Sequence, residues 1–139
     1  MKIAVSACLL GENCKYDGGN NDSEKVHRFI QGHEVIAVCP EVAGGLPTPR
    51  VPAEIVNGIV TMKDGKNVDA EFRSGAQAEV NRILEQQVEL CILQSRSPSC
   101  GVKQIYDGTF TGQKIPGQGI FAKMLCEKGI KVMDVEDLP

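Results

Sequence analysis

The sequence has no tryptophan, and only two tyrosines and four phenylalanines among its 139 residues. So few aromatic side chains leave little surface on which the bases of single-stranded nucleic acid could stack. An excess of basic residues is also lacking, because 15 Lys and Arg are set against 18 Asp and Glu, a net charge of −3. Tight binding to nucleic acid or to an anionic membrane requires a concentrated basic face. We therefore expect a small-molecule ligand rather than a nucleic acid or a membrane.

Long hydrophobic runs are absent as well. The longest, residues 35–40, falls far short of the roughly 18 residues that span a bilayer. The apolar stretch before Cys8 is too short for a signal peptide, so we expect the chain to begin at Met1 and to be cytoplasmic. Thiols stay reduced in that compartment, and we expect the six cysteines to form no disulfide framework.

Short apolar runs alternate with helical patterns along the chain. Four such runs predict buried strands over residues 3–7, 35–38, 90–93 and 130–133. Three helices are predicted between them: one capped by Asp22 or Ser23, one capped by Asp69, and one over residues 119–128 that ends at Gly129. The chain thus follows the order strand, helix, strand, helix, strand, helix, strand.

A β-hairpin is predicted between the second strand and the second helix, because residues 55–60 contain Asn57-Gly58, the signature of a two-residue turn. The other elements alternate, which implies a parallel sheet with right-handed crossovers and helices on both faces. A chain of 139 residues leaves room for a single hydrophobic core. We therefore predict one α/β domain over residues 1–139, a three-layer Rossmann-like or flavodoxin-like fold with the small hairpin outside the main sheet.

The second predicted helix carries an apolar stripe at spacings of three and four, which we expect to face the core: Phe72, Ala76, Val80, Ile83 and Leu84. Gly75 lies within this helix and is expected to weaken it slightly. In the loops, we expect positive φ angles at Gly44, Gly45 and Gly101.

Three cysteines follow the first three predicted strands. Cys8 ends the first, Cys39 ends the second, and Cys100 lies in the loop after the third. Ligands of open parallel sheets bind at the carboxyl ends of the strands, where the strand order reverses. We therefore expect these three thiols to share one site. Cys91 and Cys126 fall in apolar patterns and are expected to be small core residues.

Several kinds of metal site could use three gathered thiolates. Zinc is the weaker candidate, since structural zinc sites usually contain close cysteine pairs and the chain has no C-x-x-C and only two histidines. The cysteine runs of ferredoxins are also absent. Thiolates on three separate loops suit a [4Fe-4S] cluster with one iron free of protein ligands. Cys14 is a possible fourth ligand, although a loop or core role is favoured for it.

Polar residues surround these cysteines. Glu41 follows Cys39 closely, and the loop before Cys100 contains Ser95, Ser97 and Ser99. Loop serines usually make turn and capping hydrogen bonds, and a loop carboxylate is usually solvated. A metal site next to them would favour a chemical role instead.

Six blocks of sequence, in order along essentially the whole chain, resemble the 2-thiouracil desulfurase family: VSACLLG at 5–11, YDGG at 16–19, CPEV at 39–42, GGLPTPR at 44–50, SRSPSCG at 95–101 and YDGTF at 106–110. The resemblance implies a Rossmann-like domain and a [4Fe-4S] cluster held by three cysteines, matching Cys8, Cys39 and Cys100. It also implies a catalytic carboxylate matching Glu41 and a catalytic serine matching Ser97.

The reaction implied is a non-redox desulfuration of a thiocarbonyl compound, which gives the oxo compound and sulfide. Iron would bind the soft sulfur, Glu41 would activate water, and Ser97 would position substrate or relay a proton to a ring nitrogen. Ser95, Arg50 and Asp107 are candidates for substrate contacts, with structural roles slightly favoured for the last two. Some relatives carry a further C-terminal domain and act on transfer RNA. Because this sequence ends at Pro139, we expect 2-thiouracil or a related free nucleobase or nucleoside as substrate.

Two other functions compete with this interpretation. The same thiolates could belong to an iron-sulfur or sulfide carrier or sensor without hydrolytic turnover. A flavodoxin-type nucleotide-binding module is the weaker rival, because Gly11, Gly18 and Gly19 do not follow the G-x-G-x-x-G pattern.

Overall fold

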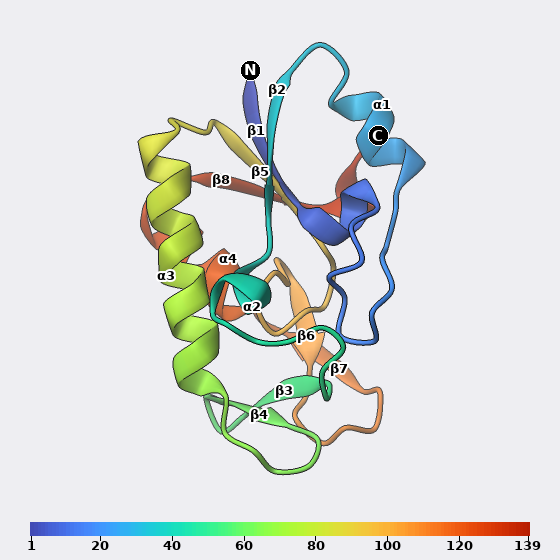
Figure 1. The fold of residues 1–139 in the computed structure, drawn as a ribbon, viewed down its shortest axis with the longest axis vertical. Coiled ribbons are helices and arrows are strands. Elements are labelled where there is room, and N and C mark those ends of the chain that lie inside the picture. Colours follow the sequence, from blue (N-terminus) through green and yellow to red (C-terminus); the bar gives the residue numbers. More distant parts are fainter.

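A four-stranded parallel sheet forms the centre of the computed structural model, which describes residues 1–139 (Figure 1). Its strands are β1 (Lys2–Ser6), β2 (Glu34–Val38), β5 (Leu90–Leu93) and β8 (Lys131–Asp134), in the order β2-β1-β5-β8. Every neighbouring pair is parallel. The predicted α/β fold is confirmed, and the strand order reverses between β1 and β5.

Helices cover both faces of this sheet, as predicted. On one face, α3 (Asp69–Glu85) and α4 (Ile120–Glu127) pack over a core of 17 buried residues that includes Phe72 and Phe121. On the other face, the short α1 (Glu24–Phe29) covers a core of 7 buried residues, among them Val26. The sheet between these two cores is apolar on both faces, and all four residues of β5 are buried.

Two predictions concern how the helices begin. Ser23 caps α1 and accepts a hydrogen bond from the Val26 amide, as predicted. Asp69 is not the cap of α3, because the helix begins at Asp69 itself. Its carboxylate instead accepts hydrogen bonds from the Val60 amide at 3.0 Å and from Nε of Arg73 at 2.6 Å. Asp69 thus ties α3 to the neighbouring hairpin.

Two residues assigned to the core lie at the surface instead. Leu84 is 46% exposed, because the buried face of α3 at this turn is occupied by Ile83. Cys126 is exposed on the outer side of α4, where the adjacent Leu125 is the residue turned inward. Cys91, by contrast, is fully buried in β5 as predicted.

Two small antiparallel hairpins lie beyond the carboxyl ends of the parallel strands (Figure 1). The predicted one joins β3 (Ala53–Val56) to β4 (Ile59–Met62) through Asn57 and Gly58, whose φ angles of 51° and 80° fit its two-residue turn. The second joins β6 (Gln104–Tyr106) to β7 (Lys114–Pro116). It was not predicted, because strands of three residues leave too short a pattern of alternation.

A short helix, α2 (Pro40–Ala43), directly follows β2 and packs against α3 through two glycines. A Cβ at Gly75 would lie 1.8 Å from the carbonyl oxygen of Pro40, and one at Gly44 would lie 2.0 Å from that of Glu71. Gly75 therefore permits a close helix contact. The positive φ expected at Gly44 is wrong, because its φ is −79°. Glycine fits at this position because a Cβ would collide with the backbone of α3.

The two other loop glycines differ from each other. Gly45 has the predicted positive φ of 88°. Gly101 does not have a positive φ. Its small size is needed because a Cβ would lie 2.7 Å from the carbonyl oxygen of Gln104.

The remaining regular elements are two turns of 3-10 helix, η1 (Ala7–Leu10) after β1 and η2 (Val135–Asp137) after β8. No helix has the length and apolar character that crossing a bilayer requires.

Candidate functional site

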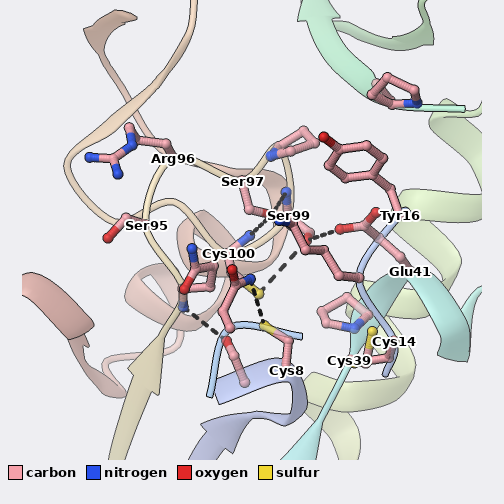
Figure 2. Close-up of a pocket in the computed structure, with 18 of the residues that line it drawn as sticks. Cys8, Cys14, Tyr16, Cys39, Glu41, Ser95, Arg96, Ser97, Ser99 and Cys100 are labelled. Carbon is pink, nitrogen blue, oxygen red and sulfur yellow. Dashed lines mark hydrogen bonds between the residues drawn. The ribbon is translucent and has the colours of Figure 1, made fainter. Parts of the chain in front are cut away.

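A cavity of about 460 Å³ lies where β1, β2 and β5 end, with residues of the two hairpins on its far side. It opens at the point of strand-order reversal, the usual ligand site of open parallel sheets. Chemistry-bearing side chains from several separate segments line it: Cys8, Cys14, Cys39, Glu41, Arg50, Ser95, Ser97, Ser99 and Cys100. Figure 2 labels all of these except Arg50.

The three strand-end cysteines all reach this cavity. Cys8 lies in η1 after β1, Cys39 is the residue before α2, and Cys100 lies in the loop after β5. They come from positions 31 and 61 residues apart in the sequence. The parallel topology brings all three to the wall of one cavity. Cys14 is a fourth thiol that lines the same cavity.

Burial is the largest cause of the raised pKa of each of these thiols. It raises the pKa of Cys8 and Cys39 above the ordinary thiol value, and that of Cys14 to about 12. It raises the pKa of Cys100 as well. Mutual repulsion among the thiolates and Glu41 adds to the effect at Cys8. Without a compensating positive charge, these sulfurs therefore remain protonated thiols at neutral pH.

The donor set fits an iron-sulfur cluster better than a single ion. Thiolates are the ligands that such clusters use, and three of them line one cavity. No three His, Cys, Asp or Glu side chains are grouped closely enough to hold one metal ion. Any group that these three thiols held together would therefore have to be larger than one ion.

Cys39 is held in place by a buried carboxylate on α3. Glu79 is only 5% exposed, and its Oε2 accepts a hydrogen bond of 2.9 Å from the Cys39 amide. Arg82 pairs with the same carboxylate at 3.1 Å and also donates to the carbonyl of Ala37 at the end of β2. Sequence reasoning missed Glu79, because it lies 40 residues from Cys39 on a helix face expected to be apolar.

The loop that carries Cys100 is fixed by the start of α4. The amides of Ile120 and Phe121 donate to the carbonyls of Pro98 and Ser99 at 2.8 and 2.9 Å. A Cβ at Gly119 would lie 2.5 Å from the Ser99 carbonyl, so only glycine permits this approach. The loop is therefore held from behind while its side chains face the cavity.

Glu41 faces the thiols from the first turn of α2 and is held at both oxygens. Oε1 accepts a hydrogen bond from Nε of Arg50 at 3.2 Å. Oε2 accepts one from the Ser99 hydroxyl at 2.9 Å (Figure 2). The side chains of Glu41 and Arg50 are 17% and 4% exposed. Charge pairs are costly to bury, so a pair held this firmly in a cavity marks a candidate functional site.

Arg50 also locks the loops around the cavity. Its guanidinium donates to the carbonyls of Cys14 and Pro47 at 2.9 and 3.2 Å, and to the Thr48 hydroxyl at 3.0 Å. With the Glu41 carboxylate, the Arg50 guanidinium thus donates hydrogen bonds to four acceptors. The structural role favoured for Arg50 accounts for its contacts, and the side chain still lines the cavity.

Ser97 organises the Cys100 loop. Its Oγ accepts hydrogen bonds from the amides of Ser99 and Cys100, both at 3.1 Å. It also lies 2.9 Å from the hydroxyl oxygen of Ser99. Ser99 is 1% exposed and directly contacts Glu41, so it belongs to the site. Its place next to Cys100 was visible in the sequence, but no pattern there predicted the contact with a residue 58 positions away.

The two other residues proposed to contact substrate are placed differently. The hydroxyl of Ser95 donates to the buried carboxylate of Asp134 at 2.7 Å, although Ser95 also lines the cavity. Asp107 is not among the residues that line the cavity. Its carboxylate accepts hydrogen bonds from the amide and hydroxyl of Thr109, and the pKa of Asp107 is lowered by them. The structure thus brings Ser95 to the site and leaves Asp107 outside the cavity wall.

Comparison with known proteins assigns this arrangement to a family. The model of the 2-thiouracil desulfurase family matches residues 3–137. The chain belongs to this family. The uncharacterized protein YbbK of Bacillus subtilis (strain 168) is 36% identical to this chain over 146 aligned positions, which cover 98% of this chain and 97% of YbbK.

A solved structure shares the whole fold. It is described as TudS, a [4Fe-4S]-dependent thiouracil desulfidase, and superposes with a TM-score of 0.92 at 42% sequence identity. The match covers 99% of this chain and 93% of the TudS chain. The family predicted from the sequence is therefore confirmed.

Proposed function

We propose that this protein removes sulfur hydrolytically from a thiocarbonyl compound, 2-thiouracil or a related thiolated nucleobase or nucleoside, and releases the oxo compound and sulfide. The observation that supports the proposal is that three strand-end thiols and one half-buried carboxylate line a single cavity. The similarity to a [4Fe-4S]-dependent thiouracil desulfidase supports the same reaction.

We propose that Cys8, Cys39 and Cys100 hold a [4Fe-4S] cluster. When bound, its iron without a protein ligand supplies a soft Lewis acid for the thiocarbonyl sulfur. Cys14 is not needed as a ligand in this arrangement. All six cysteines are free, and we expect the protein to act in the reducing cytoplasm, where such thiols persist.

Glu41 is suited to the role of general base. Arg50 holds its Oε1, so Oε2 is the oxygen that faces the hydroxyl groups of the Cys100 loop. A carboxylate fixed in this way can take a proton from a water molecule as that water attacks the thiocarbonyl carbon. No oxidant or reductant enters the balance, because water replaces sulfur at an unchanged oxidation level.

The aromatic side chains indicate the shape of the substrate. Both tyrosines of the chain, Tyr16 and Tyr106, line the cavity together with Phe110. Two of the other three phenylalanines, Phe72 and Phe121, are buried in the core. Aromatic faces beside the reacting groups favour a flat heteroaromatic ring over an aliphatic thioamide. Ser95 and Arg50 border the same space and are the candidates for polar contacts with such a ring.

Turnover separates this function from the rival carrier or sensor. Protein reconstituted with iron and sulfide in the absence of oxygen is incubated with excess 2-thiouracil, and uracil and hydrosulfide are quantified. We expect both products in equal amounts over many cycles. A carrier would release sulfide only once, up to the amount it holds, and would form no uracil.

A further inference from the structure

A chain of three side chains joined by hydrogen bonds runs along one wall of the cavity. The Ser97 and Ser99 hydroxyl oxygens are 2.9 Å apart, and Ser99 Oγ is 2.9 Å from Oε2 of Glu41 (Figure 2). Ser99 is 1% exposed, so bulk water does not replace it in this chain. Ser97 has no direct hydrogen bond to Glu41, and the two are connected through Ser99.

The direction of the hydrogen bonds follows from the partners. An ionised carboxylate can only accept, so Ser99 donates its hydroxyl proton to Glu41. Ser97 Oγ already accepts from the amides of Ser99 and Cys100. Its own proton is therefore the one shared with Ser99. The resting chain runs from Ser97 through Ser99 to Glu41, and it reverses once Glu41 is protonated.

We propose that Ser99 is the middle member of a proton relay that returns the proton taken by Glu41 to the substrate through Ser97. This inference rests on the proposed function. It adds Ser99 to the proposed catalytic groups, because Glu41 and Ser97 are connected by hydrogen bonds only through Ser99.

The proton and electron balance is complete with water and a thiolate-form substrate, in which the ring has a C=N bond beside the carbon–sulfur bond. Water attacks the carbon and gives a proton to Glu41, while the π pair of the C=N bond moves to nitrogen. That nitrogen takes the hydroxyl proton of Ser97. Ser97 then takes the hydroxyl proton of Ser99, and Ser99 takes the proton that Glu41 received from water. The C–S bond then breaks with its electron pair on sulfur, which takes the remaining hydroxyl proton and leaves as hydrosulfide as C=O forms.

The two amide hydrogen bonds at Ser97 fit this role. As Ser97 Oγ gives up its proton it becomes electron-rich and gains a third lone pair. The amides of Ser99 and Cys100 stabilise this charge from fixed positions at 3.1 Å. The third lone pair is then free to accept the proton of Ser99.

A double-mutant cycle tests the relay. Ser97→Ala, Ser99→Ala and the double variant are compared in single-turnover release of hydrosulfide from 2-thiouracil, with rates normalised to bound iron. We expect each single variant to lose about 10²-fold or more. The double variant should lose little beyond either single one, because either change breaks the same chain. Multiplying losses in the double variant would overturn the relay.

A second measurement separates proton relay from simple structural support. Rates in mixtures of H₂O and D₂O should follow a curved dependence in the wild-type protein, because several protons move together, and a straighter one in Ser99→Ala. Unchanged curvature in Ser99→Ala would contradict the relay. Ser23→Ala is the matched control, since it removes a hydroxyl that caps α1 and does not line the cavity. It should keep the wild-type rate and curvature.

The same experiment distinguishes the two levels of the proposal. Failure of the loaded wild-type protein to release hydrosulfide would overturn the proposed function, and the relay with it. Wild-type turnover together with a fully active Ser99→Ala would overturn the relay alone.

Discussion

The charged side chains at the two ends of the parallel sheet differ in how far they are exposed to solvent. At the amino end, the pair of Lys2 and Glu34 is 3.8 Å apart, and the Glu34 side chain is 81% exposed. At the carboxyl end, the side chains of Glu41 and Arg50 are only 17% and 4% exposed, and they share a cavity with the half-buried Cys8 and Cys39 and the buried Cys100. Exposed ion pairs cost little desolvation energy and add little to stability. Buried charges cost much more to desolvate, and they need hydrogen-bonding or charged partners to offset that cost. The comparison indicates that the fold concentrates its costly polar groups where the strands end, at the site of chemistry.

The largest effect on cluster binding and turnover is expected when a proposed cluster ligand at the carboxyl end of the sheet is removed. Cys8→Ala, Cys39→Ala and Cys100→Ala should each lose the visible absorbance of the cluster and all turnover, because each removes one of three thiolates. Cys126→Ala, which changes an exposed thiol on α4, should keep both. Loss of the cluster in Cys14→Ala but not in Cys8→Ala would show that the ligand set is wrong.

Removing the proposed base should reduce activity without changing the cofactor. We expect Glu41→Ala to lower the single-turnover rate with 2-thiouracil by about 10²- to 10⁴-fold, the usual contribution of general acid–base catalysis. Its iron content and visible spectrum should match those of the wild-type protein. An active Glu41→Ala protein would remove the carboxylate from the mechanism.

A smaller effect is expected from the residue that positions Cys39. Glu79→Leu leaves the Cys39 amide without its acceptor, which should destabilise the protein by about 1–3 kcal/mol in urea unfolding. It should also speed the loss of iron to a chelator. Glu79→Gln keeps an oxygen at this position and should show a smaller loss. Equal behaviour of the two variants would mean that the hydrogen bond does not hold Cys39.

The smallest effect is expected at the amino end of the sheet. Lys2→Ala removes the exposed contacts of Lys2 with Glu34 and Gln86 and should change the free energy of unfolding by less than about 1 kcal/mol. Turnover should not change. A large loss of activity in this variant would show that the two ends of the sheet are coupled.

The sequence carries much of this site but not its internal connections. Cys8, Cys39 and Cys100 were placed together because apolar runs identify parallel strands, and such strands end on one side of a sheet. Glu79 and Ser99 were not assigned roles, because their partners lie 40 and 58 residues away and no spacing rule reports such contacts. Cys126 was misplaced, because periodicity alone did not show which side of α4 is buried.

The contact between α2 and α3 gives a similar lesson. Gly75 looked like a weak point of a helix when considered by its propensity alone. In the structure it allows the carbonyl of Pro40 to approach α3, which sets the position of α2 and therefore of Glu41. A local preference was outweighed by a tertiary contact that the sequence does not encode as a pattern.

The most direct test measures cluster content and turnover in the same samples. The protein is reconstituted without oxygen to several levels of loading, and iron, acid-labile sulfide and the rate of uracil formation from 2-thiouracil are determined for each. We expect about four iron and about four sulfide per chain at full loading, and a rate that rises in proportion to them from zero. Uracil formation by the iron-free protein, or no uracil formation at full loading, would contradict the account.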